Sequence, residues 1–181
     1  MNEYSDIVNA LLEQANKQNI KISFEVGDKT ELEIVKKQLP LSNDLESFYL
    51  HANPEVAAWP STVGRLKLYN LANIYNNQIG YRWDKKNVGK SLANDWNYNW
   101  VAIGDISADP IIADVTNICE ASIKIDRHDV VTLNPLIIAP NIKTFLRFIY
   151  LWNKVFLEKY NKLVDEENDE LRADFLHDLR C

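Results

Sequence analysis

The carboxylates in the middle of the chain are the side chains whose types and spacing could best support chemistry. Asp105, Asp109 and Asp114 lie at the ends of, or within, two apolar runs that predict neighbouring strands. Two carboxyl groups that converge on a cleft with separated pKa values can act as general acid and general base. Spacing does not establish convergence, and carboxylates are common at turns without any catalytic role. We therefore expect a protein that is not an enzyme, and catalysis by these carboxylates is the weaker hypothesis.

Other catalytic and metal-binding signatures are absent from the sequence. The three histidines, His51, His128 and His177, lie far apart, and neither an HExxH nor a CxxC spacing occurs. The sequence contains no GxSxG motif, and its 5 glycines form no phosphate-binding loop. Cys119 and Cys181 form no disulfide framework, and Cys119 is expected to be a buried, inert thiol. We expect no catalytic residue, no metal and no cofactor.

Composition and charge narrow the classes of partner. The chain has 181 residues, with 20 Lys and Arg against 26 Asp and Glu, which gives a formal net charge of −6. An acidic chain repels phosphate backbones, and the pairs Lys36–Lys37 and Lys85–Lys86 stand isolated in the sequence, so we expect no nucleic-acid partner. The first residues lack the pattern of a signal peptide, and no apolar run is long enough to span a bilayer. These features predict a cytoplasmic protein with reduced thiols and no membrane association.

One acidic stretch suggests a binding surface. No Lys or Arg occurs from Ser91 to Ile123, whereas the stretch contains several carboxylates, among them Asp95, Asp105 and Asp109. An exposed acidic patch can steer a basic protein partner into contact. The alternative is that buried strands simply exclude long basic side chains. On the first interpretation, Asp95, Asp105 and Asp109 are candidate partner-binding residues.

The five tryptophans divide into two groups. Trp100 and Trp152 lie in apolar patterns and are expected in the core. Trp59, Trp83 and Trp96 lie in predicted loops among polar residues. Exposed aromatic side chains on loops often anchor interfaces, so these three are also candidate partner-binding residues. The alternative, which the sequence leaves equally open, is that they fold back over the edge of the sheet.

These side chains must be positioned by helices and strands that the apolar periodicity predicts. Helical spacing occurs over residues 4–15, 32–39, 43–52 and 142–160, with one or two helical turns over 71–75. Strand patterns occur over 20–26, 65–69, 100–103 and 111–115, and a hairpin is expected to join 123–125 to 130–133. A single domain over 1–181 follows, in which 161–181 is an appended C-terminal helix with an acidic linker. Strands bracketed by helices predict an α+β fold with a mostly antiparallel central sheet.

Three blocks of this sequence resemble the SUKH superfamily, which includes a yeast cell-wall-assembly regulator and many bacterial immunity proteins. The first block is Glu31–Pro40, which continues through Leu45–Tyr49 to Asn53 and looks like a pair of family helices. The second block, Trp100–Asp105 followed by Asp109–Asp114, is similar to the family's paired central strands. The third, Ile138–Asn141 with Phe145 and Leu146, is similar to its closing helix. Pro54 and the single Gly104 depart from the family's glycine pattern.

The resemblance implies an α+β domain that binds a protein and performs no catalysis. In bacteria the partner of such a domain is often a toxin delivered by a neighbouring cell. We therefore expect an immunity protein that neutralises a polymorphic or contact-dependent toxin, with a basic toxin domain as its partner. The alternative is a regulatory or scaffold domain in cell-envelope or signalling control. The sequence leaves the oligomeric state open.

Overall fold

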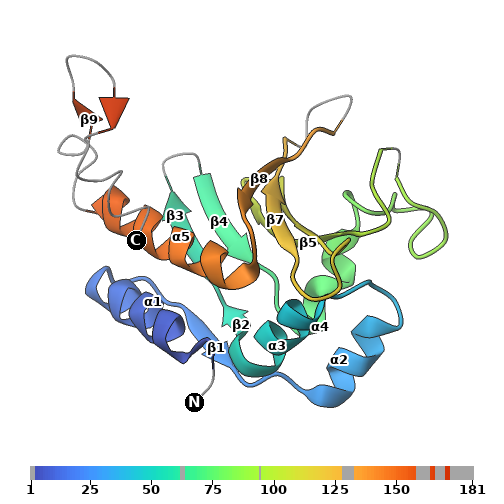
Figure 1. Cartoon of the computed structure of the whole chain (residues 1–181), viewed down its shortest axis with the longest axis horizontal. Coiled ribbons are helices and arrows are strands. Elements are labelled where there is room, and N and C mark those ends of the chain that lie inside the picture. The colour runs from blue at the N-terminus through green and yellow to red at the C-terminus, as the bar shows by residue number, and fades with distance from the viewer. Residues whose placement is uncertain are drawn as a thin grey trace.

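The computed structural model describes residues 3–61, 64–93, 95–127, 133–157, 164–165 and 170–171. Its centre is a six-stranded antiparallel sheet whose strands lie in the order β3–β4–β5–β6–β7–β8 (Figure 1). The strands are β3 (Ala58–Ser61), β4 (Gly64–Leu68), β5 (Trp100–Ile106), β6 (Asp109–Asp114), β7 (Ser122–Ile125) and β8 (Leu136–Ala139). Each strand pairs with its sequence neighbour, so the sheet is a meander in which β5 and β6 are central.

The remaining elements surround this sheet. The helices are α1 (Ser5–Lys17), α2 (Lys29–Lys36), α3 (Asn43–Ala52), α4 (Leu71–Ile74), the 3₁₀ helix η1 (Asn76–Gln78) and α5 (Ile142–Leu157). Two short strands, β1 (Ser23–Glu25) and β2 (Asn53–Val56), form a separate antiparallel pair. A second small pair joins β9 (Val164–Asp165) to β10 (Glu170–Leu171).

One face of the six-stranded sheet is covered by helices, and we call it the helix-side face. Helix α5 packs across it and α1 runs alongside α5 (Figure 1). The apolar residues of α5 recur at helical spacing, and the buried apolar side chains in its described part are Ile142, Phe145, Leu146 and Ile149. They share one core cluster with the strand residues that point the same way, which are Val101, Ile103, Ile111, Ala113 and Ile123. Removal of this apolar area from water is the main stabilising contribution on this face.

Side chains at the helix N-termini explain where several helices begin. The Asp28 carboxylate accepts a hydrogen bond from the Glu31 backbone N–H at 2.8 Å, at the start of α2. Asn70 caps α4 in the same way through the Asn73 N–H at 2.9 Å. Such caps satisfy backbone donors that have no partner within the helix.

The predicted α+β architecture, with an antiparallel sheet and helices at its N- and C-terminal sides, is confirmed. The predicted strands around Trp100 and Ile111 are neighbours, but both are longer than expected. Gly104 lies inside β5 and not in the β5–β6 turn. A Cβ at this position would lie only 2.3 Å from the Lys67 carbonyl oxygen of β4, which explains why the residue is glycine. The β5–β6 turn instead consists of Ser107 and Ala108, whose φ values are 53° and 78°.

Two predicted elements near the C-terminus differ or fall outside the described residues. The strand that pairs with β7 is β8, and most of the partner expected at 130–133 lies outside the described residues. Within the segment 161–181, where an appended C-terminal helix with an acidic linker is predicted, residues 164–165 and 170–171 form an antiparallel strand pair. The rest of that segment also lies outside the described residues.

Three expectations about burial need correction. Trp100 and Trp152 are half-buried and not in the core. Trp152 lies against Phe148 on α5, with their ring centroids 5.8 Å apart. Trp100 lies on the face of the sheet that is opposite to α5. Cys119 is exposed, because it lies in the connection between β6 and β7 and not within a strand.

Candidate functional site

The second face of the sheet carries polar and aromatic side chains, and we call it the loop-side face. Because side chains alternate along a strand, the strand register identifies its members. Lys67 lies opposite Asp105, and Trp100 lies opposite Asp114. Members of this face include Lys67, Tyr69, Trp100, Ala102, Asp105, Ile112, Asp114 and Lys124. No helix of the core cluster packs against this set, and its charged members lie toward the two ends of the face.

The centre of the loop-side face is covered by the segment 79–99, whose described residues form no helix or named strand. Trp96 from this segment is buried with Tyr69, Ala102 and Ile112. The Trp96 indole donates a hydrogen bond to the Trp100 carbonyl oxygen at 2.9 Å, and the two rings meet edge to face with centroids 5.9 Å apart. The segment therefore adheres to the sheet through aromatic packing.

A tyrosine–carboxylate group lies at the end of this face beside the β5–β6 turn. The Tyr69 hydroxyl donates to the Asp105 carboxylate at 2.8 Å, and the Tyr81 hydroxyl donates to the Ala108 carbonyl oxygen at 2.9 Å. Burial raises the pKa of Tyr69 well above its usual value, and the hydrogen bond to Asp105 raises it further. The bond from Tyr81 fixes Ala108, a residue without glycine's freedom at positive φ. This end of the face is therefore held in one conformation.

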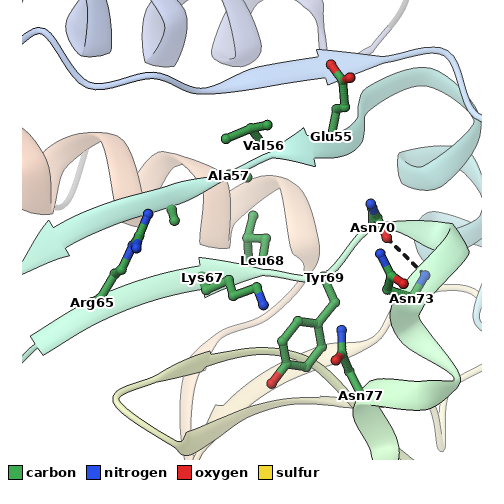
Figure 2. A pocket seen from close by; sticks show the side chains of 11 residues that line it. Glu55, Val56, Ala57, Arg65, Lys67, Leu68, Tyr69, Asn70, Asn73 and Asn77 are labelled. Carbon is green, nitrogen blue, oxygen red and sulfur yellow. Dashed lines mark hydrogen bonds between the residues drawn. The ribbon is translucent and has the colours of Figure 1, made fainter.

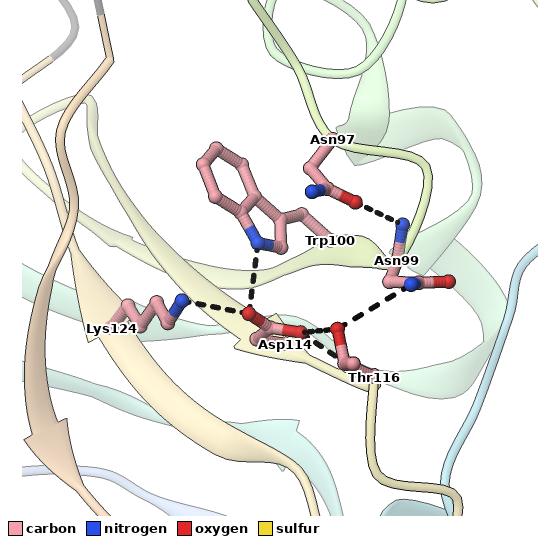
Figure 3. A network of polar contacts seen from close by, with 6 residues as sticks. All are labelled: Asn97, Asn99, Trp100, Asp114, Thr116 and Lys124. Carbon is pink, nitrogen blue, oxygen red and sulfur yellow. Dashed lines mark hydrogen bonds and ion pairs between the residues drawn. The ribbon is translucent and has the colours of Figure 1, made fainter.

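A second polar group lies at the opposite end and is centred on Asp114 (Figure 3). The Asp114 carboxylate accepts hydrogen bonds from Lys124 Nζ at 2.7 Å, from the Trp100 indole at 3.1 Å and from the Thr116 hydroxyl at 2.6 Å. Partial burial opposes ionisation of Asp114, but these hydrogen bonds outweigh it and lower the pKa to about 2. Asp114 is therefore ionised throughout the neutral range.

A polar cleft of about 430 Å³ adjoins the loop-side face where β3 and β4 meet α4 (Figure 2). Three asparagines, Asn70, Asn73 and Asn77, line one side of it, and Lys67 and Tyr69 line another. Lys67 Nζ lies 5.5 Å from the centre of the Tyr69 ring, which is a cation–π contact. The cleft extends the polar surface beyond the sheet.

The acidic-patch prediction is only partly supported by this geometry. Asp105 and Asp109 lie on the two strands of the β5–β6 hairpin beside its turn, and both act electrostatically on Tyr81. Asp95 is exposed on the covering segment, with a φ of 64°, and no described contact joins it to them. Lys67 and Lys124, from the strands that flank β5 and β6, stand beside the carboxylates. The face therefore carries both signs of charge. The stretch 91–123 has no basic residue of its own, but the neighbouring strands place lysines beside its carboxylates.

The prediction that Trp59, Trp83 and Trp96 anchor a partner from exposed loops is wrong. The three side chains are 1%, 4% and 5% exposed. Trp59 lies on β3, with its ring centroid 6.4 Å from that of Phe24, and Trp83 packs against Tyr75 at 4.8 Å. The alternative interpretation, that they fold back over the sheet, agrees with their burial.

Several residues of this face escaped the sequence analysis. Lys67 and Tyr69 alternate with Leu66 and Leu68 in a strand that the sequence did predict, so their shared face could have been found from period-two spacing. No comparable signal marks Gln78, which is completely buried. Its side-chain amide exchanges hydrogen bonds with the backbone of Ala102, at 3.0 and 2.8 Å.

Comparison with known proteins identifies no relative: no protein-family model matches the chain, and neither the curated proteins nor the solved structures contain a significant match. Among the described residues, no group of three or more His, Cys, Asp or Glu side chains could hold a metal ion. No helix in the same part of the chain has the length and apolar character needed to cross a membrane.

Proposed function

We propose that this chain is a non-enzymatic protein-binding module and that its partner docks on the loop-side face. The observation that carries the proposal is the fixed arrangement of charged and aromatic groups across that face. Tyr69 and Asp105 at one end, and Asp114 and Lys124 at the other, are joined by hydrogen bonds of 2.8 and 2.7 Å. A preorganised surface loses little conformational entropy when a partner binds, which favours affinity and specificity.

The state of the carboxylates supports binding over catalysis. A general acid or base works best when its pKa lies near the operating pH. Asp114 has a pKa of about 2 and is held by Lys124, so it can neither donate nor readily accept a proton near neutral pH. Asp105 is hydrogen-bonded to Tyr69, whose raised pKa keeps the phenol protonated. A phenol that is held as a hydrogen-bond donor is suited to recognition.

Within this class, an immunity protein that neutralises a bacterial toxin is the function we favour. Its support is the resemblance of the Glu31–Asn53 and Trp100–Asp114 blocks to the SUKH superfamily, together with the acidic net charge of −6. The alternative is a regulatory or scaffold domain in cell-envelope or signalling control. Genetic context separates the two, because a neighbouring gene for a large secreted protein with a variable C-terminal domain favours immunity.

The test is the rate of association with that neighbouring toxin domain, measured by stopped-flow fluorescence at low and high salt. Carboxylates that steer a basic partner accelerate encounter, and salt screens them over about 8–10 Å at physiological strength. We expect the double variant Asp105→Asn with Asp109→Asn to associate about tenfold more slowly at low salt, with little change in dissociation.

The matched control is Asp6→Asn with Glu13→Gln, which removes the same charge from exposed positions on α1. We expect this control to associate at nearly the wild-type rate. Equal slowing by both double variants would indicate a general effect of net charge and would remove the loop-side face from the mechanism. Failure of the purified toxin domain to bind at micromolar concentrations would contradict the immunity function itself.

A further inference from the structure

A second cleft, of about 370 Å³, lies between the C-terminal end of α2 and the segment 82–98, away from the polar groups described above. Four cationic residues line it, and no Asp or Glu stands among its described lining residues. These cations are Lys36, Lys37, Arg82 and Lys90. In a chain with a net charge of −6, this local concentration of positive charge is exceptional. Lys36 and Lys37, an isolated pair in the sequence, acquire basic neighbours through the fold.

Not all of this charge is available to a ligand. Lys36 Nζ already binds the carboxylates of Glu46 at 2.8 Å and Glu33 at 3.5 Å. The C-terminal carbonyl groups of α2 also contribute about half a negative charge. Lys37 and Lys90 are exposed, and neither forms an ion pair within the described part of the chain. Together with Arg82 they leave the cleft with an excess of positive charge.

Arg82 is the observation that points to an anionic ligand. Its side chain is 3% exposed, and its Nη1 donates to the carbonyl oxygens of Tyr98 at 2.9 Å and Trp100 at 2.6 Å. Its Nε is buried without a hydrogen-bond partner, and among the described residues no carboxylate pairs with the guanidinium. Burial lowers the pKa of Arg82. A buried charge without a counter-ion is costly, and an anion bound in the cleft would compensate it.

An aromatic ring beside this cation suggests what else the ligand contains. Tyr98 also lines the cleft, and its side chain is 68% exposed, which is unusual for a large aromatic residue. The Arg82 guanidinium lies 5.4 Å from the centre of the Tyr98 ring and holds it by a cation–π contact. Because the Tyr98 ring is exposed and held in place, it is available for stacking against a flat ring.

We propose that this cleft binds a phosphate monoester attached to a planar ring, of the size of a mononucleotide. Arginine and lysine recognise phosphate through charge-assisted hydrogen bonds, and a phosphate dianion can bind several cations together. The cleft volume lies at the small end of the range for ligand pockets, about 300–1,000 Å³. This site is separate from the loop-side face, and the proposal does not depend on protein binding.

The probe is adenosine monophosphate, titrated calorimetrically into the full chain at constant ionic strength. Adenosine tests the ring without phosphate, inorganic phosphate tests the anion without a ring, and a tri-glutamate peptide tests carboxylates. We expect adenosine monophosphate to bind at least tenfold more tightly than each of the three. Tighter binding of the peptide would overturn the proposal in favour of an acidic protein segment, and no measurable binding at millimolar concentration would remove the site.

Variants of the exposed cations locate the site without disturbing the buried arginine. The double variant Lys37→Gln with Lys90→Gln is expected to weaken adenosine monophosphate binding at least tenfold. The matched control, Lys85→Gln with Lys86→Gln, removes the same charge from exposed residues nearby that do not line the cleft. Tyr98→Leu should weaken adenosine monophosphate binding and leave phosphate binding unchanged. Equal losses in both double variants would show non-specific attraction and contradict the proposal.

Discussion

The two faces of the six-stranded sheet are covered in different ways. On the helix-side face, α5 and α1 close a large cluster of buried apolar side chains. On the loop-side face, a segment without regular structure covers a small cluster of Tyr69, Trp96, Ala102 and Ile112, with charged groups at both ends. The same strands thus contribute to a core on one side and to a polar, hydrogen-bonded surface on the other.

The difference follows from how each cover satisfies its backbone polar groups. A helix satisfies them internally and can present an apolar stripe to the sheet. The segment 79–99 satisfies only part of its backbone groups, through turns, and side chains of this region bond to further backbone groups. The Arg82 guanidinium and the Trp96 indole both bind the Trp100 carbonyl oxygen. A covering segment of this kind brings polar side chains to the sheet, and they provide the specific contacts that recognition requires.

The largest expected effect compares one tryptophan from each face. Trp59→Ala should lower the free energy of unfolding by about 3–5 kcal/mol, because it removes a side chain that is 1% exposed and leaves a cavity in the main core. Trp96→Ala should cost less, about 2–3 kcal/mol, since its half-exposed neighbours on the loop-side face can close over the space. Urea denaturation of both variants measures the difference.

Trp59→Phe is the control for cavity formation. The Trp59 indole N–H is buried without a partner among the described residues, so its removal sacrifices no hydrogen bond. We expect a loss of about 1–2 kcal/mol from the reduced volume. Equal costs for Trp59→Ala and Trp96→Ala would break the distinction between a face closed by helices and a face covered by a loop segment.

The next effect concerns Gln78, which continues the sheet where β4 ends. The last β4 residue, Leu68, pairs with Gly104, so the outward backbone groups of Ala102 have no strand partner. The Gln78 amide binds both of them and also the Ile74 carbonyl oxygen at 2.8 Å. Gln78→Leu keeps the volume but leaves these buried groups unpaired, and should cost about 2–4 kcal/mol.

Asn76→Ala is the matched control for Gln78→Leu. Asn76 lies on the same 3₁₀ helix with an exposed side chain, and its substitution should change the free energy of unfolding by less than about 0.5 kcal/mol. Thermal and urea melts of both variants provide the comparison. A Gln78→Leu variant as stable as wild type would show that the amide only fills space.

The contrast between the faces also explains what the sequence could predict. Apolar periodicity found α5, β5 and β6, because burial on a regular element imposes a repeat on the sequence. Nothing periodic marks Gln78 or Arg82, since each acts through one side chain directed at backbone groups far along the chain. The loop tryptophans carried no signal that could separate burial from exposure.

The candidate site was also predictable only in part from the sequence. The sequence identified Asp105 and Asp109 on one hairpin, because strand ends and turns are local features. It missed Lys67 and Lys124, which adjoin the acidic stretch only through strand pairing. The charge of a surface in a sheet therefore depends on neighbouring strands as well as on the local sequence. The cleft that holds Lys37 and Lys90 likewise combines charges that are far apart in the sequence.

The smallest effect is confined to the loop-side face and depends on pH. The Asp114 side chain is 14% exposed, and its pKa is lowered from 3.8 to about 2 in the folded protein. A carboxylate with a lowered folded-state pKa stabilises the fold above its unfolded pKa, and this contribution is lost as the pH falls through the folded value. The contribution is on the order of 2 kcal/mol at neutral pH.

We therefore expect the stability advantage of the wild type over Asp114→Asn to be constant from pH 7 to about 5. It should then shrink between about pH 4 and pH 2, the window between the two pKa values. Urea denaturation at several pH values measures the advantage. Lys124→Met removes the 2.7 Å ion pair, so the loss of this stability advantage should then move to higher pH.

Parallel curves for wild type and Asp114→Asn down to pH 2 would show that the network in Figure 3 does not hold the carboxylate ionised. The polar end of the loop-side face would then lack the rigidity on which the proposed binding depends.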